Sequence, residues 1–292
     1  METHFTIPHR EKLSAVMHTP NDLQPGEKRP AFIILCGFGG SKDTPEHIAQ
    51  ANLMCDLGYC AIRFDMPGCG ESEGERGRLI ILEQVDATMS VFEFMANRPE
   101  VDPSRIGLYG DSLGAAVAIY AAGLHEEIAA VISCGGWGEG SRKFRKQHST
   151  PEAWKKFTNL LEKGRRMRIE TGETLMIPRF DIVPIPEKLR KSLTGGVIME
   201  FPVDTVESMY NARPQDVVSF IAPRPLLLMH PADDSVTPTI ESIKLFQRAG
   251  QPTELFLLAG EDHFPLSGPN PSRVPHYIKT WVNKYFPLST VD

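Results

Sequence analysis

The pattern Gly-x-Ser-x-Gly, which can present a serine hydroxyl for covalent catalysis, occurs twice in this sequence. The first copy, residues 70–74 with Ser72 at its centre, has no strand directly before it and no helical pattern starting at its serine. The second, residues 110–114 with Ser112 at its centre, follows an apolar run and leads into a helical pattern of small residues. A strand–turn–helix setting exposes such a serine on a tight turn. We therefore predict that Ser112 is a nucleophile, rather than a simple helix N-cap, and that Ser72 is a polar loop residue.

A serine hydroxyl is a weak nucleophile near neutral pH, so it needs a general base that is itself oriented by a carboxylate. We expect His263 to be this base, because it stands in a loop directly after the apolar run 254–258. The other histidines after Ser112 lie in less suitable places. We expect His125 at the end of a helix, His148 in a basic segment, His230 at the end of a strand and His276 in a C-terminal helix. The orienting carboxylate is expected from the loop 231–238, which offers Asp233 and Asp234.

Acyl transfer also needs N–H donors aimed at the negative oxygen that develops on the carbonyl. Leu113, the residue after the predicted nucleophile, is expected to supply one backbone N–H, and Phe38 in the glycine-rich turn 37–40 is expected to supply another. The alternative for that turn is a simple loop. A phosphate-binding loop is excluded because Lys42 occupies the position of the last glycine in Gly-x-Gly-x-x-Gly. Neither His-Glu-x-x-His nor a Cys/His cluster occurs, so we expect no metal and no cofactor.

These residues must be positioned by a regular scaffold, and the chain shows short apolar runs that alternate with helical patterns. Most of the runs are apolar throughout rather than alternating, as in strands that are covered on both faces. Their alternation with helices predicts an α/β fold with a doubly wound, mostly parallel sheet, preceded by an antiparallel hairpin over residues 5–7 and 12–18. The expected parallel strands are 31–36, 60–64, 106–109, 128–133, 225–229 and 254–258, and the expected helices include 45–58, 79–97 and 112–122.

The alternation stops between residues 137 and 216, where no convincing buried strand is seen. We expect an inserted, mainly helical lid or cap there, with residues 1–136 and 217–292 forming the core. Part of this insertion, residues 142–191, is strongly basic, with 14 Lys and Arg against 6 Asp and Glu. Aromatic and apolar side chains near the expected site are candidates for the substrate pocket, with ordinary core packing as the alternative: Phe38, Trp137, Met176, Phe180 and Phe201.

Composition is that of a globular protein of 292 residues with 41% hydrophobic and 23% charged residues. A net charge of −6 gives no reason to expect a nucleic-acid partner, and no apolar stretch is long enough for a membrane span. The five cysteines form no Cys-x-x-Cys pair, which favours reduced thiols in a cytoplasmic protein. A small-molecule substrate is the expected partner, and the sequence leaves open whether the chain forms a homo-oligomer.

The segments 36–42, 63–74 and 101–114 resemble those of the α/β-hydrolase superfamily, particularly esterases similar to dienelactone hydrolases and to the catalytic domain of prolyl-oligopeptidase-type enzymes. The resemblance implies a chain order of serine, acid and histidine, and the family's spacing to a following proline favours Asp234 over Asp233. Two positions depart from the pattern. Cys36 stands where the family often has histidine, and Ser112 stands where dienelactone hydrolases have cysteine.

Together these features predict a serine hydrolase that cleaves an ester in a small or medium organic substrate through an acyl-enzyme. A carbon–carbon bond hydrolase, a thioesterase or an acyltransferase could use the same three residues. A peptidase is disfavoured, because prolyl-oligopeptidase-type peptidases carry a large additional domain. The alternative from another class is a non-catalytic binding protein on a hydrolase scaffold, which would usually have lost one of the three residues.

Overall fold

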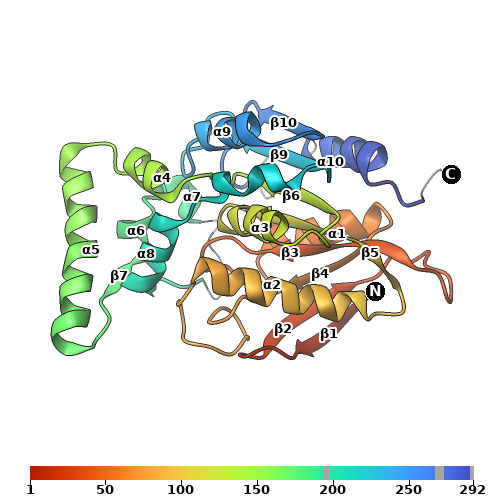
Figure 1. The fold of residues 1–292 in the computed structure, drawn as a ribbon, viewed down its shortest axis with the longest axis horizontal. Coiled ribbons are helices and arrows are strands. Elements are labelled where there is room, and N and C mark those ends of the chain that lie inside the picture. The colour runs from red at the N-terminus through yellow and green to blue at the C-terminus, as the bar shows by residue number, and fades with distance from the viewer. Residues whose placement is uncertain (192, 194–196, 267–272, 290–292) are drawn as a thin grey trace.

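A mostly parallel eight-stranded sheet forms the centre of the computed structural model, which describes residues 1–191, 193, 197–266 and 273–289 (Figure 1). The spatial order is β1-β2-β4-β3-β5-β6-β9-β10. β1 and β2 form an antiparallel hairpin, β2 pairs antiparallel with β4, and the other neighbours are parallel. The strands are β1 (Glu2–Ile7), β2 (Leu13–His18), β3 (Arg29–Leu35), β4 (Cys60–Phe64), β5 (Val101–Asp111), β6 (Ala130–Cys134), β9 (Leu226–Pro231) and β10 (Thr253–Leu258). The predicted fold class and the leading hairpin are confirmed.

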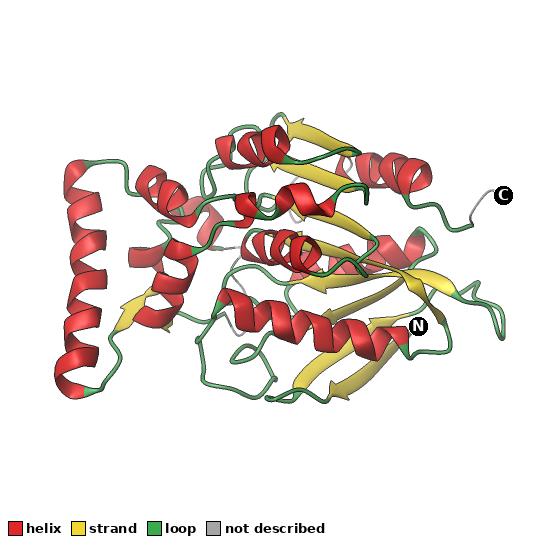
Figure 2. Cartoon of the chain, viewed as in Figure 1, coloured by secondary structure: helices red, strands yellow, loops and turns green. Residues whose placement is uncertain are grey.

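Helices cover both faces of this sheet (Figure 2). Along β3, Ile33 packs in the core that includes the helices on one face, whereas Phe32 and Ile34 pack in the core on the other face. Alternate side chains of a strand point to opposite faces, so a strand covered on both sides is apolar at every position. The first face carries α2 (Ile81–Ala96), α3 (Leu113–Leu124) and α9 (Ile240–Arg248), and the second carries α1 (Pro45–Asp56) and α10 (Arg273–Tyr285).

The segment between β6 and β9 projects beyond the sheet, and its longest helix, α5, stands farthest from it in Figure 1. It contains α4 (Gly140–Gln147), α5 (Pro151–Thr171), α6 (Arg179–Ile182), α7 (Glu187–Arg190) and α8 (Val203–Asn211), followed by the short 3-10 helices η1 (Pro214–Asp216) and η2 (Val218–Ile221). It also contains a small antiparallel pair, β7 (Met176–Pro178) and β8 (Glu200–Pro202), which the sequence reading missed. Two strands of three residues, each ending in proline, are too short to show an alternating pattern.

None of the helices in the described ranges is long and apolar enough to cross a membrane.

The beginning of this projecting segment is tied to α9 by the fully buried carboxylate of Glu241. Its oxygens accept hydrogen bonds from Arg142 on α4, at 2.7 Å from both Nε and Nη2. They also accept the backbone N–H groups of Gly138 at 3.1 Å and Glu139 at 3.2 Å. Charge-assisted bonds of this kind are among the stronger ones in proteins, so Glu241 fixes how the chain leaves the sheet after β6.

Replacing Glu241 with alanine should therefore destabilise the fold by about 3 kcal/mol, because Nε and Nη2 of Arg142 and two backbone N–H groups lose their acceptor, while Nη1 of Arg142 keeps Glu139. The free energy of unfolding measured in urea tests this. Glu254→Ala is the control, since Glu254 pairs with the exposed Lys284 and should cost less than about 1 kcal/mol. Equal losses in the two variants would contradict the anchoring role of Glu241.

Candidate active site

Ser112 lies on a tight turn between the end of β5 and the start of α3, with φ of 52° and ψ of −113°. It is the only non-glycine residue with positive φ in the part of the chain that the structure describes. The turn is tight because glycines flank it: a Cβ on Gly110 would collide with the backbone of Gly114, and one on Gly114 with the carbonyl of Leu35. The Ser112 N–H donates to the carbonyl of Cys134 on β6 at 2.9 Å. This is the strand–turn–helix setting expected from the sequence.

Three of the predicted residues form a hydrogen-bonded chain. His263 Nε2 lies 3.0 Å from Ser112 Oγ, and His263 Nδ1 lies 2.8 Å from Asp234 Oδ2. Both distances suit proton transfer and orientation of an imidazole. Asp234 stands in the loop after β9, and its side chain is fully buried, whereas its neighbour Asp233 is exposed. The structure thus brings together the residues that the sequence nominated, with Asp234 as the carboxylate that contacts the histidine.

Asp234 is held as an anion by its surroundings. Burial alone would raise its pKa, but His263 and His230 outweigh burial and hold the pKa well below its usual range. The second oxygen, Oδ1, accepts the backbone N–H groups of Val236 at 2.8 Å and Thr237 at 2.7 Å. Burial alone would likewise lower the pKa of His263, but the Asp234 carboxylate raises it above its ordinary value. His230, which the sequence places at the end of a strand and disfavours as the base, lies 3.4 Å from Asp234 Oδ2, a contact that its spacing did not indicate.

The two expected oxyanion donors border the same cavity as Ser112 and His263. Leu113 follows Ser112 at the first position of α3, and Phe38 lies in the glycine-rich turn after β3. That turn packs closely on the tight turn at residues 110–114, which we call the elbow, since a Cβ on Gly37 would lie 2.9 Å from Asp111 Oδ2. The Phe38 carbonyl accepts a hydrogen bond from Arg179 Nη2 at 2.6 Å. The loop is therefore held from both sides, by the elbow and by a guanidinium of the projecting segment.

A second histidine–carboxylate pair supports the turn. His47 Nε2 lies 2.8 Å from Asp111 Oδ1, and His47 Nδ1 lies 2.8 Å from the carbonyl of Ser41. Burial alone would lower the pKa of His47, but the negative charge of Asp111 raises it well above its ordinary value. Asp111 thus ties the end of β5 to α1, whose His47 in turn contacts the turn after β3.

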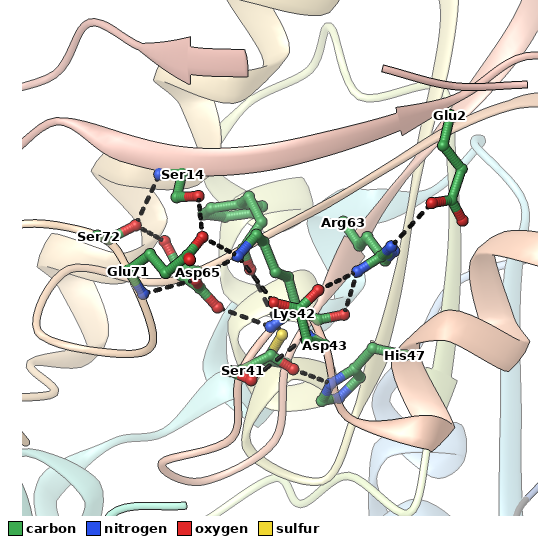
Figure 3. Close-up of polar contacts among 12 residues, drawn as sticks. Glu2, Ser14, Ser41, Lys42, Asp43, His47, Arg63, Asp65, Glu71 and Ser72 are labelled. Carbon is green, nitrogen blue, oxygen red and sulfur yellow. Dashed lines mark hydrogen bonds and ion pairs between the residues drawn. The ribbon is translucent and has the colours of Figure 1, made fainter. Parts of the chain in front are cut away.

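Ser72, the alternative serine, belongs to a buried charged network that is shown in Figure 3. Its hydroxyl donates to the carbonyl of Asp65 at 2.6 Å and accepts the Ser14 N–H at 2.9 Å. The side chain of Asp65 accepts Lys42 Nζ at 3.1 Å and the Lys42 N–H at 2.7 Å, and Lys42 Nζ also contacts Glu71 at 2.7 Å. The network joins the loops after β3 and β4, so Ser72 and Asp65 hold loops in place, which for Ser72 agrees with the polar loop role expected of it.

The cavity beside Ser112 has a volume of about 300 Å³. Of the five side chains expected to line the pocket, Phe38 and Trp137 do so. The structure does not place the other three on this wall. Phe201 is buried behind Phe38, with their rings stacked at 4.0 Å, Phe180 lies under the guanidinium of Arg190, and Met176 is 44% exposed. These three predictions are wrong because an apolar or aromatic residue type does not by itself tell which face of a short helix or strand the side chain occupies.

Among the cavity residues that were not found from the sequence are two buried cations, Lys143 on α4 and Arg179 on α6. Both are buried, at 3% and 4% exposure. Burial lowers the pKa of Lys143 to about 7 and that of Arg179 to about 10. They belong to a segment with many basic residues, and nothing in their spacing separates these two from the exposed ones.

The sequence profile of proteins with the alpha/beta hydrolase fold matches residues 30–267, so the chain belongs to this family. Polyketide transferase claH of Penicillium crustosum is 28% identical over 268 residues, which cover 78% of this chain and 83% of claH. The solved structure of alpha/beta hydrolase GrgF from Penicillium sp. sh18 is similar with a TM-score of 0.78 at 21% identity and covers 98% of both chains. A soluble variant of monoglyceride lipase from Saccharomyces cerevisiae, in complex with a substrate analog, is similar with a TM-score of 0.76 at 16% identity, over 99% of this chain and 96% of that chain.

Replacing Asp234 with asparagine should lower the pKa of His263, because the imidazole stays buried but loses the carboxylate that favours its charged form. NMR titration of the imidazole resonances measures this directly. Asp233→Asn is the matched control, since Asp233 is exposed and adjacent in sequence, and it should leave the His263 titration where it is. An unchanged His263 pKa in Asp234→Asn would show that Asp234 is not its partner.

Proposed function

We propose that this protein is a serine hydrolase that cleaves an ester of a small or medium organic acid through an acyl-enzyme. The observation that carries the proposal is the chain of contacts from Ser112 through His263 to Asp234, at 3.0 Å and 2.8 Å, on the wall of a cavity. Serine, histidine and a buried carboxylate in this arrangement are the standard means of activating a hydroxyl for attack on a carbonyl.

In the first half of the proposed reaction, Ser112 Oγ attacks the ester carbonyl while its proton moves to His263 Nε2. The negative oxygen of the tetrahedral intermediate would accept the N–H groups of Phe38 and Leu113. As the intermediate collapses, the bond to the leaving oxygen breaks and that oxygen takes the proton from His263. Asp234, which stays ionised, stabilises the imidazolium formed in between. An alcohol leaves, and the acyl group remains on Ser112.

In the second half, water attacks the acyl carbonyl and gives a proton to His263. The bond to Ser112 Oγ then breaks, Oγ takes the proton back, and a carboxylic acid leaves. Only a neutral imidazole can accept these protons. Because the pKa of His263 is raised, hydrolysis should decline on acidification at a higher pH than a free imidazole would give.

A fluorophosphonate probe should label the wild-type protein at Ser112, and Ser112→Ala should lose both the label and ester hydrolysis, by about 10³-fold or more. Ser72→Ala is the matched control, because Ser72 is the other serine in a Gly-x-Ser-x-Gly pattern and is occupied by loop contacts. It should keep the label. Mass spectrometry locates the label, and a label that persists in Ser112→Ala would refute the assignment.

A second function, acyl transfer, is favoured by one observation: the relative claH is named a polyketide transferase. The first half of the reaction is the same in both functions. In transfer, an alcohol or amine replaces water as the nucleophile that removes the acyl group from Ser112. The two functions therefore differ only in which acceptor reaches the acyl-enzyme.

The partition of the acyl group between water and an added alcohol separates these functions. With a nitrophenyl ester as donor, a hydrolase should release carboxylic acid as its main product whatever alcohol is added. Chromatographic analysis of the products measures the ratio of new ester to acid, with Ser112→Ala as the background control. A new ester that dominates at low alcohol concentration would move the assignment from hydrolase to acyltransferase.

A further inference from the structure

The buried ammonium of Lys143 is one of the charged groups in the cavity wall that the proposed mechanism does not use. Lys143 lies on α4 and lines the cavity that also contains Ser112 and His263. The side chain is 3% exposed, so its charged end faces the cavity and the protein interior rather than bulk water. A buried charge is costly unless it is paired, which makes the surroundings of this group informative.

In the described part of the chain, the groups that contact the Lys143 ammonium are aromatic faces rather than anions. Lys143 Nζ lies 4.0 Å from the ring centre of Phe144 and 5.5 Å from that of Trp137. Within the described ranges, no carboxylate or other acceptor makes an ion pair or hydrogen bond with Nζ. The acid that acts on Lys143 electrostatically is Glu241, and both of its oxygens are already bonded to Arg142.

The rest of the cavity wall is also short of free negative charge. Asp111 is paired with His47, and the Glu46 carboxylate accepts the Leu266 N–H at 3.2 Å. Arg179 adds a second buried cation; its two terminal nitrogens donate to the carbonyls of Ile198 and Phe38 rather than to carboxylates. As far as the described residues form it, the wall is thus apolar and cationic, with the exposed Lys191 as a third cation and its acidic groups already in use.

We propose that Lys143 binds a carboxylate carried by the substrate, so that the ester cleaved at Ser112 belongs to a molecule with a free carboxylate elsewhere. This rests on the proposed function for the identity of the reacting bond, but not for the binding site itself. A substrate carboxylate would supply the counter-charge that Lys143 lacks, in a site shielded from water, where an ion pair is stronger than at a surface. Burial also lowers the pKa of Lys143 to about 7, and a bound carboxylate would restore its charged form.

Binding is tested with Ser112→Ala, which should not turn over the probes. The probes are the mono-nitrophenyl esters of succinate, glutarate and adipate, each compared with the ester whose free carboxylate is replaced by a carboxamide of the same size. Quenching of tryptophan fluorescence or calorimetry gives Kd. We expect at least one chain length at which the carboxylate binds about tenfold or more tightly than the carboxamide.

Adding Lys143→Met to this background should remove most of the preference for the carboxylate, and Lys143→Arg should retain part of it. Lys146→Met is the matched control, because Lys146 is an exposed lysine on the same helix, and it should retain the full preference. Circular dichroism checks that each variant is folded. Equal binding of the two probes at every length, or a preference that survives Lys143→Met, would overturn the proposal.

The same probes with Ser112 intact test the chemistry separately. The ratio of kcat/KM for the carboxylate ester to that for the carboxamide ester should fall about tenfold or more in Lys143→Met and stay constant in Lys146→Met. If neither ester is hydrolysed while the Lys143-dependent binding preference persists, the proposed function fails and the carboxylate site stands. If both are hydrolysed with a ratio that does not depend on Lys143, the carboxylate site fails and the hydrolase stands.

Discussion

Three chain segments meet at the backbone of Ser112, and the geometry of the site depends on how closely they approach. A non-glycine residue at φ of 52° and ψ of −113° is strained, at a cost of about 1–3 kcal/mol, and persists only where its neighbours hold it. β6 holds the Ser112 N–H, β3 packs against Gly114, and the turn after β3 packs against Asp111. A larger residue at Gly110 or Gly114 would force these segments apart. The 3.0 Å contact between Ser112 Oγ and His263 depends on this packing.

The charged side chains around the elbow form pairs, and each pair positions a different part of the site. Asp234 orients His263, Asp111 binds His47 beneath the glycine-rich turn, and Asp65 binds Lys42 between two loops. Asp234–His263 and Asp65–Lys42 each join loops that follow different strands, and Asp111–His47 joins the end of β5 to α1. The ends of the parallel strands are therefore held together where the site lies. Buried ion pairs of this kind add little to stability when compared with apolar packing, but breaking one is costly. Their value here is in fixing loop positions.

Much of the fold and the central site could be predicted from the sequence because the signals are local. A strand buried on both faces is apolar at most positions, as β3 and β4 are apart from Arg29 and Arg63, and the helices between strands begin and end close to the expected residues. Ser112, Asp234 and His263 each follow a predicted strand, and parallel strands end at one edge of a sheet. Local sequence therefore placed them near one another without any knowledge of contacts.

The cavity wall could not be predicted in the same way. Lys143 and Arg179 come from short helices of the projecting segment, where burial depends on packing against distant elements rather than on periodicity. The same limit applies to Met176, Phe180 and Phe201, whose types suit a pocket but whose positions do not line it. His230 contacts Asp234 because β9 and the following loop fold back on each other. These contacts are properties of the tertiary structure.

The hydrogen bond from Arg179 to the Phe38 carbonyl has a consequence for sequence changes in the projecting segment. The peptide groups of the glycine-rich turn are steadied by a side chain from the segment that also shapes the cavity. Insertions or exchanges in that segment would therefore alter the fit of ligands and the alignment of the turn together. A lineage that acquires a new ligand by rebuilding this segment must keep a donor where Arg179 stands, or find another brace for the turn. A change in the projecting segment therefore affects the shape of the cavity and the position of the glycine-rich turn at the same time.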